Sequence, residues 1–158
     1  MNTSIRLIAP EDMDAVIALV IEAGLFPATE TALLSRMLTD YFDGHASGYI
    51  SVVDEERVLR GVAYHVPAPA TEGTWYLTMI AVHPVTQRQG QGTLLLNHVE
   101  NEVRAQGRIL LVETSGVPEY DQARSFYTKC GYQQEARIRD YYDTGNDMVL
   151  FRKVLNQK

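Results

Sequence analysis

The residues with the clearest chemical meaning form a glycine-bearing turn between an apolar strand and an apolar helix. The turn reads Val82-His83-Pro84-Val85-Thr86-Gln87-Arg88-Gln89-Gly90-Gln91-Gly92-Thr93. The first N–H groups of a helix have no partner inside it, and the helix dipole is positive at that end. Gly90 and Gly92 let a ligand approach the backbone closely, and Arg88 adds positive charge. We expect an anion site here, for a phosphate or pyrophosphate, with a purely structural turn as the alternative.

Two well-known phosphate-binding motifs do not fit this turn. The dinucleotide-binding fingerprint needs a third glycine, and this chain has Leu95 in its place. A Walker loop ends on Gly-Lys-Ser or Gly-Lys-Thr, which the turn lacks. A nucleotide-binding α/β protein therefore remains an alternative that the sequence disfavours.

Two blocks of the chain resemble the GCN5-related N-acetyltransferase (GNAT) family. Gln87-Arg88-Gln89-Gly90-Gln91-Gly92, after Val82-His83-Pro84, resembles its acyl-coenzyme A signature, Gln/Arg-x-x-Gly-x-Gly/Ala. Residues 123–132, Ala-Arg-Ser-Phe-Tyr-Thr-Lys-Cys-Gly-Tyr, resemble its block Ala-x-x-Phe-Tyr-x-x-x-Gly-Phe/Tyr. Both the order and the separation of the blocks match. The resemblance implies an enzyme that transfers an acetyl group from acetyl-CoA to a primary amine, directly in a ternary complex.

The resemblance also implies roles for individual residues. Backbone amides of Gln87, Arg88, Gln89, Gly90, Gln91, Gly92 and Thr93 would hold the coenzyme A pyrophosphate. The strand edge at Ile80, Ala81 and Val82 would bind the pantetheine arm, in a gap where two parallel strands splay apart. An N–H near Val82 would stabilise the developing oxyanion. Tyr127 would act as general acid toward the leaving thiolate, since a phenol is protonated at neutral pH.

The chain departs from the family pattern at two positions. Many members carry a glutamate on the central strand as general base, but residues 75–82 include no acid. Glu113, at the end of the next predicted strand, is our substitute, with a solvated carboxylate as the alternative. Tyr120 stands where the family often has asparagine, so we expect it to contact coenzyme or substrate.

Apolar spacing and turn signals predict the elements that position these residues. We expect strands at Ser4–Ile8, Gly48–Val53, Val58–Val66, Trp75–Val82, Arg108–Thr114, Tyr132–Tyr142 and Asp147–Val154. Helices are expected from Pro10 to Gly24, at Thr29–Asp40 with an apolar face that includes Leu33, at Gly90–Gln106 and at Tyr120–Lys129. This order predicts a mixed α/β fold with a mostly antiparallel sheet of about seven strands flanked by helices. It matches the family fold along nearly the whole chain.

Size and composition exclude several classes of protein. The chain has 158 residues and a net charge of −6, so we expect one domain over residues 1–158. The acidic balance argues against nucleic acid as a partner, because phosphate binding needs a basic surface. We expect a cytoplasmic protein, because the chain shows no apolar run long enough for a membrane span and no signal peptide. The single cysteine, Cys130, cannot form an internal disulfide, and the four histidines show no metal-ligand spacing.

The acceptor is the least determined part of the prediction. It is a primary amine on a small molecule, or a protein N-terminus or lysine. Tyr141, Tyr142, Asp140 and Asp143 cluster near the last predicted turn and suit an amine, with an exposed loop as the alternative. A non-catalytic sensor that binds acyl-CoA is the second functional hypothesis. A homodimer that pairs through the hairpin Tyr132–Val154 is also possible.

Overall fold

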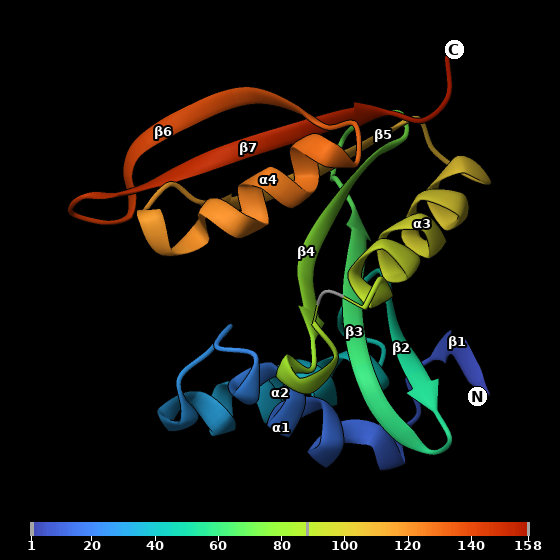
Figure 1. Ribbon diagram of the computed structural model, residues 1–158. Helices are drawn as coiled ribbons and strands as arrows, with labels where there is room; N and C mark the ends of the chain where they lie inside the picture. Colours follow the sequence, from blue (N-terminus) through green and yellow to red (C-terminus); the bar gives the residue numbers. More distant parts are fainter. Residues whose placement is uncertain (1, 88, 158) are drawn as a thin grey trace. The chain divides into compact units, whose positions relative to one another are not determined.

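The structure, a computed structural model, describes residues 2–87 and 89–157. Seven strands, four α-helices and short 3-10 turns follow one another along the chain (Figure 1). The strands are β1 (Thr3–Leu7), β2 (Tyr49–Glu55), β3 (Val58–Pro67), β4 (Thr74–Val82), β5 (Ile109–Ser115), β6 (Gln133–Asp143) and β7 (Asn146–Val154). The helices are α1 (Met13–Glu22), α2 (Thr31–Phe42), α3 (Gln91–Arg104) and α4 (Asp121–Lys129).

The predicted elements are confirmed in type and order, and most ends shift by one to three residues. Pro10 opens a 3-10 turn, Pro10–Asp12, rather than the helix itself. Gly24 ends the first helical segment with φ +79°, a conformation that glycine adopts without strain. The predicted apolar face of α2 was wrong at Leu33, which is 56% exposed, while Leu34 and Leu38 are buried.

The strands pair in the order β1-β2-β3-β4-β5-β7-β6. β4 and β5 run parallel, with Thr74–Leu77 opposite Ile109–Val112. The pairs β1–β2, β2–β3, β5–β7 and β6–β7 are antiparallel. The predicted fold class is confirmed: a mixed α/β protein with a mostly antiparallel seven-stranded sheet and one parallel strand pair.

The chain forms two compact units. Unit 1 comprises residues 1–66 and 79–99, and unit 2 comprises residues 67–78 and 100–158. The boundaries between them fall at the last residue of β3, within β4 and within α3. The single domain expected over residues 1–158 stays a prediction.

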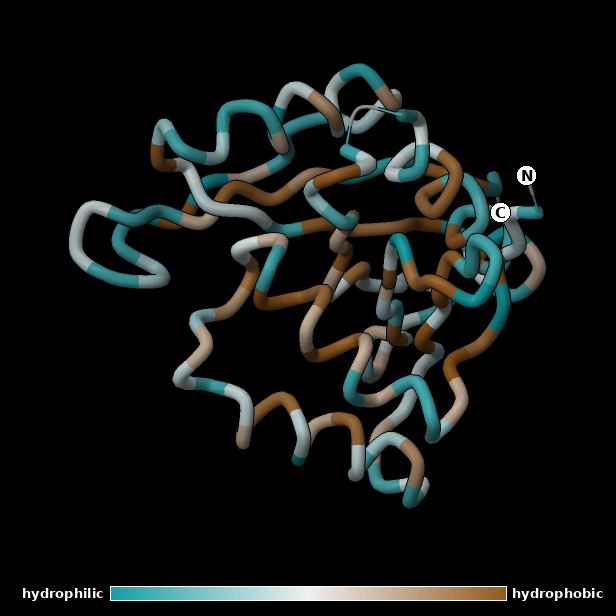
Figure 2. The backbone as a smooth tube through the Cα atoms, turned by 60° about the horizontal axis from the view of Figure 1, so that its bottom comes forward, coloured by the Kyte–Doolittle hydropathy of each residue, from teal (hydrophilic) through white to brown (hydrophobic). Residues whose placement is uncertain are grey.

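The core of unit 1 lies where α1 and α2 cover its strands. In Figure 2, hydrophobic residues recur along the helices with hydrophilic residues between them. The buried side chains of this core include Val16, Val20, Leu34, Leu38, Ile50, Val52, Val62, Met79 and Ala81. Close packing also decides the identity of Gly61, because a Cβ there would lie 2.8 Å from Leu95 of α3.

Unit 2 is built around β5, β7 and β6, with α4 running along β7 (Figure 1). Leu110, Val112, Val149 and Phe151 are buried between them. Within the described residues, no helix is long and apolar enough to cross a membrane.

Candidate functional site

The turn that leads into α3, in unit 1, has the geometry of an anion site. Gly90 has φ +82°, and Leu94 N–H donates to its carbonyl at 3.0 Å, so Gly90 caps the helix. A Cβ at Gly90 would meet nothing within 4 Å, so glycine is needed here for its conformation and not for space. Because α3 begins at Gln91, the amides of Gln91, Gly92 and Thr93 belong to its first turn, where the positive end of the helix dipole lies. Arg88 lies outside the described residues.

The glutamines of this turn donate hydrogen bonds to other groups of the protein. Gln87 Nε2 donates to the Val82 carbonyl at 3.2 Å, and Gln91 Nε2 donates to Glu55 at 3.1 Å. The Gln87 and Gln89 amides also donate, to the carbonyls of Pro84 and Thr86. These two amides therefore help to close the turn, and the set of pyrophosphate donors from Gln87 to Thr93 stays a prediction.

His83 fixes the start of the turn from two sides. Its Nδ1 accepts a hydrogen bond from Val85 N–H at 3.2 Å, and its Nε2 contacts Glu22 at the end of α1 at 2.9 Å. Its own backbone N–H donates to the Arg60 carbonyl on β3 at 2.8 Å. Sequence reasoning did not find this role, because Glu22 is distant in the chain.

The parallel ladder of β4 ends before the three residues predicted to bind pantetheine. Leu77 opposite Val112 is its last pair, and Ile80, Ala81 and Val82 follow. Ala81 is buried, and Ile80 and Val82 are half-buried.

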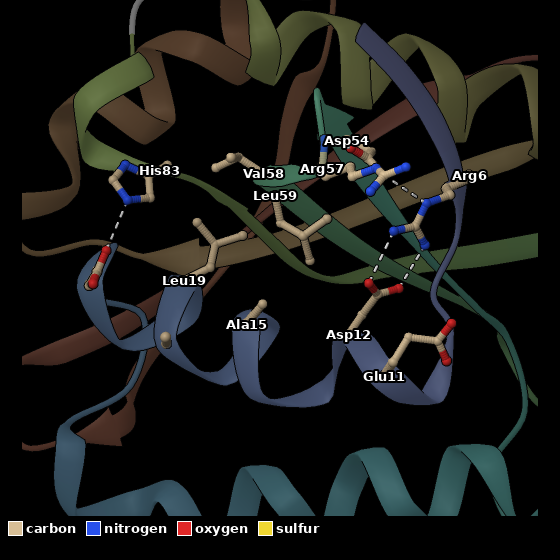
Figure 3. Close-up of a pocket in the computed structure, with 12 residues that line it drawn as sticks. Arg6, Glu11, Asp12, Ala15, Leu19, Asp54, Arg57, Val58, Leu59 and His83 are labelled. Atoms are coloured by element: carbon tan, nitrogen blue, oxygen red, sulfur yellow. Dashed lines mark hydrogen bonds and ion pairs between the residues drawn. The ribbon is translucent and has the colours of Figure 1, made fainter. Parts of the chain in front are cut away.

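A hollow of about 820 Å³ lies in unit 1 between α1, β1 and the β2–β3 turn (Figure 3). Arg6 donates to both carboxylate oxygens of Asp12, at 2.7 and 3.0 Å, and to Asp54 at 3.2 Å. The hydrogen bonds from Arg6 hold the pKa of Asp12 below its ordinary value. The sequence did not reveal this cluster, in which one arginine is paired with two aspartates, and it contains none of the predicted site residues.

Tyr127 lies in an aromatic cluster in unit 2. Its side chain is 5% exposed, and its ring centroid lies 5.4 Å from Phe126, 5.9 Å from Tyr132 and 5.6 Å from Phe151. Burial, with a smaller effect of Cys130, raises the pKa of the Tyr127 phenol above its ordinary value. The phenol therefore carries its proton at neutral pH, and in the described part of the chain its hydroxyl makes no hydrogen bond.

The buried carboxylate of Glu100 holds Tyr132, one of the rings of this aromatic cluster. Tyr132 donates its hydroxyl to Glu100 at 2.8 Å, and Lys153 Nζ lies 3.1 Å from the same carboxylate. Burial and this carboxylate raise the pKa of Tyr132, which keeps the phenol a donor. The sequence alone does not reveal the role of Glu100. It lies beside the apolar face of α3, and its partners Tyr132 and Lys153 are distant in the chain.

Glu113 lies on the opposite face of β5 from this cluster. Its neighbour Val112 pairs with Phe151, which contacts Tyr127, and successive side chains of a strand point to opposite faces. Glu113 is exposed, and its Oε1 accepts a hydrogen bond from the Tyr142 hydroxyl at 3.2 Å. The structure therefore places Tyr127 and Glu113 on two faces of the unit 2 strands.

Tyr142 connects Glu113 with the other predicted acceptor residues. Burial and the charge of Glu113 raise the pKa of Tyr142, and the Tyr141 ring lies beside it with the centroids 4.9 Å apart. Asp140 and Asp143 instead accept hydrogen bonds from the turn amides of Gly145 and Thr144. Glu113, rather than these aspartates, therefore supplies the carboxylate beside the tyrosines.

Among the described residues, no three histidine, cysteine or acidic side chains are arranged to hold a metal ion. Cys130 is half-buried, and burial raises the pKa of its thiol, so it is a poor nucleophile at neutral pH.

Comparison with known proteins agrees with these features. Residues 17–132 match the model of the acetyltransferase (GNAT) family. A GNAT-family protein from Desulfovibrio desulfuricans is 31% identical, with TM-score 0.92 over 98% of this chain and 100% of that chain. No curated protein matches the chain.

Two more distant structures share the fold. The ribosomal-protein-S18-alanine N-acetyltransferase from Escherichia coli is 20% identical, with TM-score 0.79 over 99% of this chain and 96% of that chain. The yncA protein from Salmonella typhimurium, solved with acetyl-CoA, is 18% identical, with TM-score 0.77 over 100% and 96%. The family match covers most of the chain and includes both motif blocks, so the chain belongs to the GNAT family of acetyltransferases.

Proposed function

We propose that this protein transfers an acetyl group from acetyl-CoA to a primary amine, directly in a ternary complex. The observation that carries the proposal is Tyr127: a buried, protonated phenol whose hydroxyl has no partner among the described residues. A tyrosine that served only packing would gain nothing from a hydroxyl in an aromatic cluster.

The residues of unit 1 fit the donor. The first-turn amides of α3, at Gln91, Gly92 and Thr93, suit a pyrophosphate, because they lie at the positive end of a helix. The edge of β4 at Ile80, Ala81 and Val82 lies beyond the ladder with β5, which supports its proposed contact with the pantetheine arm. Bound acetyl-CoA supplies an acetyl group activated as a thioester.

Two residues of unit 2 would move protons. Glu113 takes one proton of the acceptor ammonium on its Oε2, which has no partner in the described part of the chain, while Oε1 accepts from Tyr142. The neutral amine then attacks the thioester carbon. The carbon–nitrogen bond forms, and Tyr127 gives its phenolic proton to the sulfur as the carbon–sulfur bond breaks. The second nitrogen proton leaves to solvent, and the phenolate of Tyr127 regains a proton from solvent. An amide near Val82 stabilises negative charge on the carbonyl oxygen.

The remaining predictions are part of the proposal. The acceptor is an amine on a small molecule, a protein N-terminus or a lysine, and the protein works in the cytoplasm without metal or nucleic acid. Tyr120, the last residue of the 3-10 turn before α4, contacts coenzyme or substrate. Pairing of two copies through the hairpin Tyr132–Val154 stays a prediction.

A calorimetric titration with acetyl-CoA, with ATP and NAD as controls, tests the donor. We expect stoichiometric binding of acetyl-CoA alone. Thiol release with a panel of amines then tests transfer. No binding would overturn the proposal. Binding with slow release that Tyr127→Phe leaves unchanged would instead favour a sensor that binds acyl-CoA without turnover.

A further inference from the structure

The strand β6 leaves its ladder at an irregularity that exposes two tyrosines. Ile138 pairs with Met148 and Asp143 pairs with Asn146, so residues 139–142 of β6 stand opposite one residue of β7, Asp147. Asp140 has φ +56°, a left-handed conformation that is uncommon outside glycine. A bulge of this kind redirects side chains away from the regular pleat.

Hydrogen bonds hold the bulge in place. Asp147 accepts from Asp140 N–H at 2.9 Å and from Arg137 Nε at 2.7 Å. The Asp140 carboxylate accepts from Gly145 N–H at 2.8 Å and so ties the bulge to the turn. The pKa of Asp147 is lowered by these same hydrogen bonds, those from Asp140 and Arg137. The bulge is therefore a defined structure and not a loose edge.

Tyr141 and Tyr142 form what we call the tyrosine corner. Their ring centroids lie 4.9 Å apart and their planes meet at 88°, so the rings make two perpendicular walls. Tyr141 is 51% exposed and Tyr142 is 43% exposed. Large aromatic side chains that are held by a defined bulge and left open to solvent suggest a ligand site.

The charge beside the corner identifies the ligand class. The Tyr142 hydroxyl reaches the carboxylate of Glu113 at 3.2 Å, so one negative group lies at the edge of the walls. Aromatic faces attract ammonium groups through the negative face of the ring, most strongly where water is partly excluded. An anion or a neutral apolar group would gain less from the same surroundings.

We propose that the tyrosine corner binds a second cationic nitrogen of the acceptor, so that the substrate class is diamines and longer polyamines. The inference rests on the proposed function, because it takes the reacting ammonium to lie at Glu113. The Tyr142 hydroxyl meets the same carboxylate at 3.2 Å, so the corner begins directly beside the reacting nitrogen. A monoamine would use Glu113 and leave the two rings without a ligand.

Initial rates with three acceptors test the proposal. 1,4-Diaminobutane carries the second cation, 4-amino-1-butanol replaces it with a hydroxyl, and 1-aminopentane replaces it with a methyl group. We expect kcat/KM for the diamine to exceed that for each of the others by about fivefold or more. Equal values for the three acceptors would overturn the inference.

The Tyr141→Leu variant separates the contribution of the aromatic ring to the diamine preference from the contribution of the nearby charges. It removes one aromatic wall and leaves every charged group in place, so we expect the diamine preference to fall toward one. Tyr49→Leu removes another exposed tyrosine, on β2 of unit 1, and is the matched control. If Tyr141→Leu keeps the full preference, the attraction comes from charge alone and the corner is not the site.

Binding without transfer distinguishes this inference from the proposed function. Butyltrimethylammonium is a cation that cannot be acetylated, and its calorimetric titration needs no acetyl-CoA. We expect Tyr141→Leu to weaken its binding about fivefold and Tyr49→Leu to leave it unchanged. Ring-dependent binding in a protein that transfers no acetyl group would overturn the proposed function alone. Transfer without ring-dependent binding of this cation would overturn the corner alone.

Discussion

The turn before α3 in unit 1 offers a ligand mainly backbone groups, whereas the aromatic cluster of unit 2 offers one side chain. The side chains of Gln87 and Gln91 form hydrogen bonds within the protein, so we propose the first-turn amides of α3 as the groups that bind a ligand. At Tyr127 the backbone belongs to helix α4, so the side-chain hydroxyl is the group that the residue offers to a ligand. A backbone site is sensitive to chain conformation, and a side-chain site is sensitive to a single functional group.

The aromatic cluster is the region where one atom should matter most. Tyr127→Phe removes the hydroxyl and keeps the ring contacts. We expect kcat to fall by about a hundredfold or more while affinity for acetyl-CoA stays near wild type. Steady-state kinetics with calorimetry check this. A kcat within twofold of wild type would show that Tyr127 serves packing.

Unit 1 contains a buried base, His65, whereas the buried group of unit 2 is an acid. Burial keeps the imidazole of His65 neutral. Burial, with a smaller effect of His98, lowers the pKa of His65 to about 4. The unfolded chain, in which histidine titrates near 6.5, binds the extra proton between these values. Stability is therefore complete above about pH 6.5 and falls by about 3 kcal/mol as the pH drops toward 4.

Urea unfolding across this pH range measures the effect. His65→Asn should flatten the fall, and His45→Asn, at an exposed histidine, should leave it as in wild type. Equal slopes in all three proteins would mean that His65 becomes protonated in the folded state.

A substitution that changes the backbone conformation of Gly90 tests the proposed pyrophosphate site at the turn before α3. An alanine there needs a left-handed conformation that costs about 1–2 kcal/mol, so we expect Gly90→Ala to weaken acetyl-CoA binding roughly tenfold. Gly24→Ala is the matched control, because Gly24 has φ +79° and equally open surroundings at the end of α1. If both variants bind acetyl-CoA like wild type, the turn is structural only.

The smallest effect is expected at His83, which supports the turn without being one of the proposed donors. His83→Ala removes the acceptor for Val85 N–H, and a lost cap of this kind costs about 1 kcal/mol. Affinity for acetyl-CoA should fall about fivefold. His83→Asn offers an oxygen in place of Nδ1 and should restore most of it. Equal loss in both variants would point to the contact with Glu22 instead.

Local patterns were sufficient for most of the fold. Apolar alternation and helical spacing predict the strands and helices, and glycine and proline mark their ends, because these signals act between near neighbours in the chain. The turn before α3 was predictable for the same reason: a strand, two glycines and a helix follow one another directly. Leu33 was misplaced, since only packing decides which of two adjacent leucines is buried.

Groups that meet across long stretches of chain were decided by the tertiary structure. Glu100 with Tyr132 and Lys153, His83 with Glu22, and Tyr142 with Glu113 each join distant segments. The bulge in β6 depends on Asp147 of the next strand, so no pattern within β6 predicts it. The sequence by itself thus determined the elements, their order and the chemistry of single residues. The pairing of charges, the face on which each side chain lies and the exposure of the tyrosine corner depend on contacts that exist only after folding.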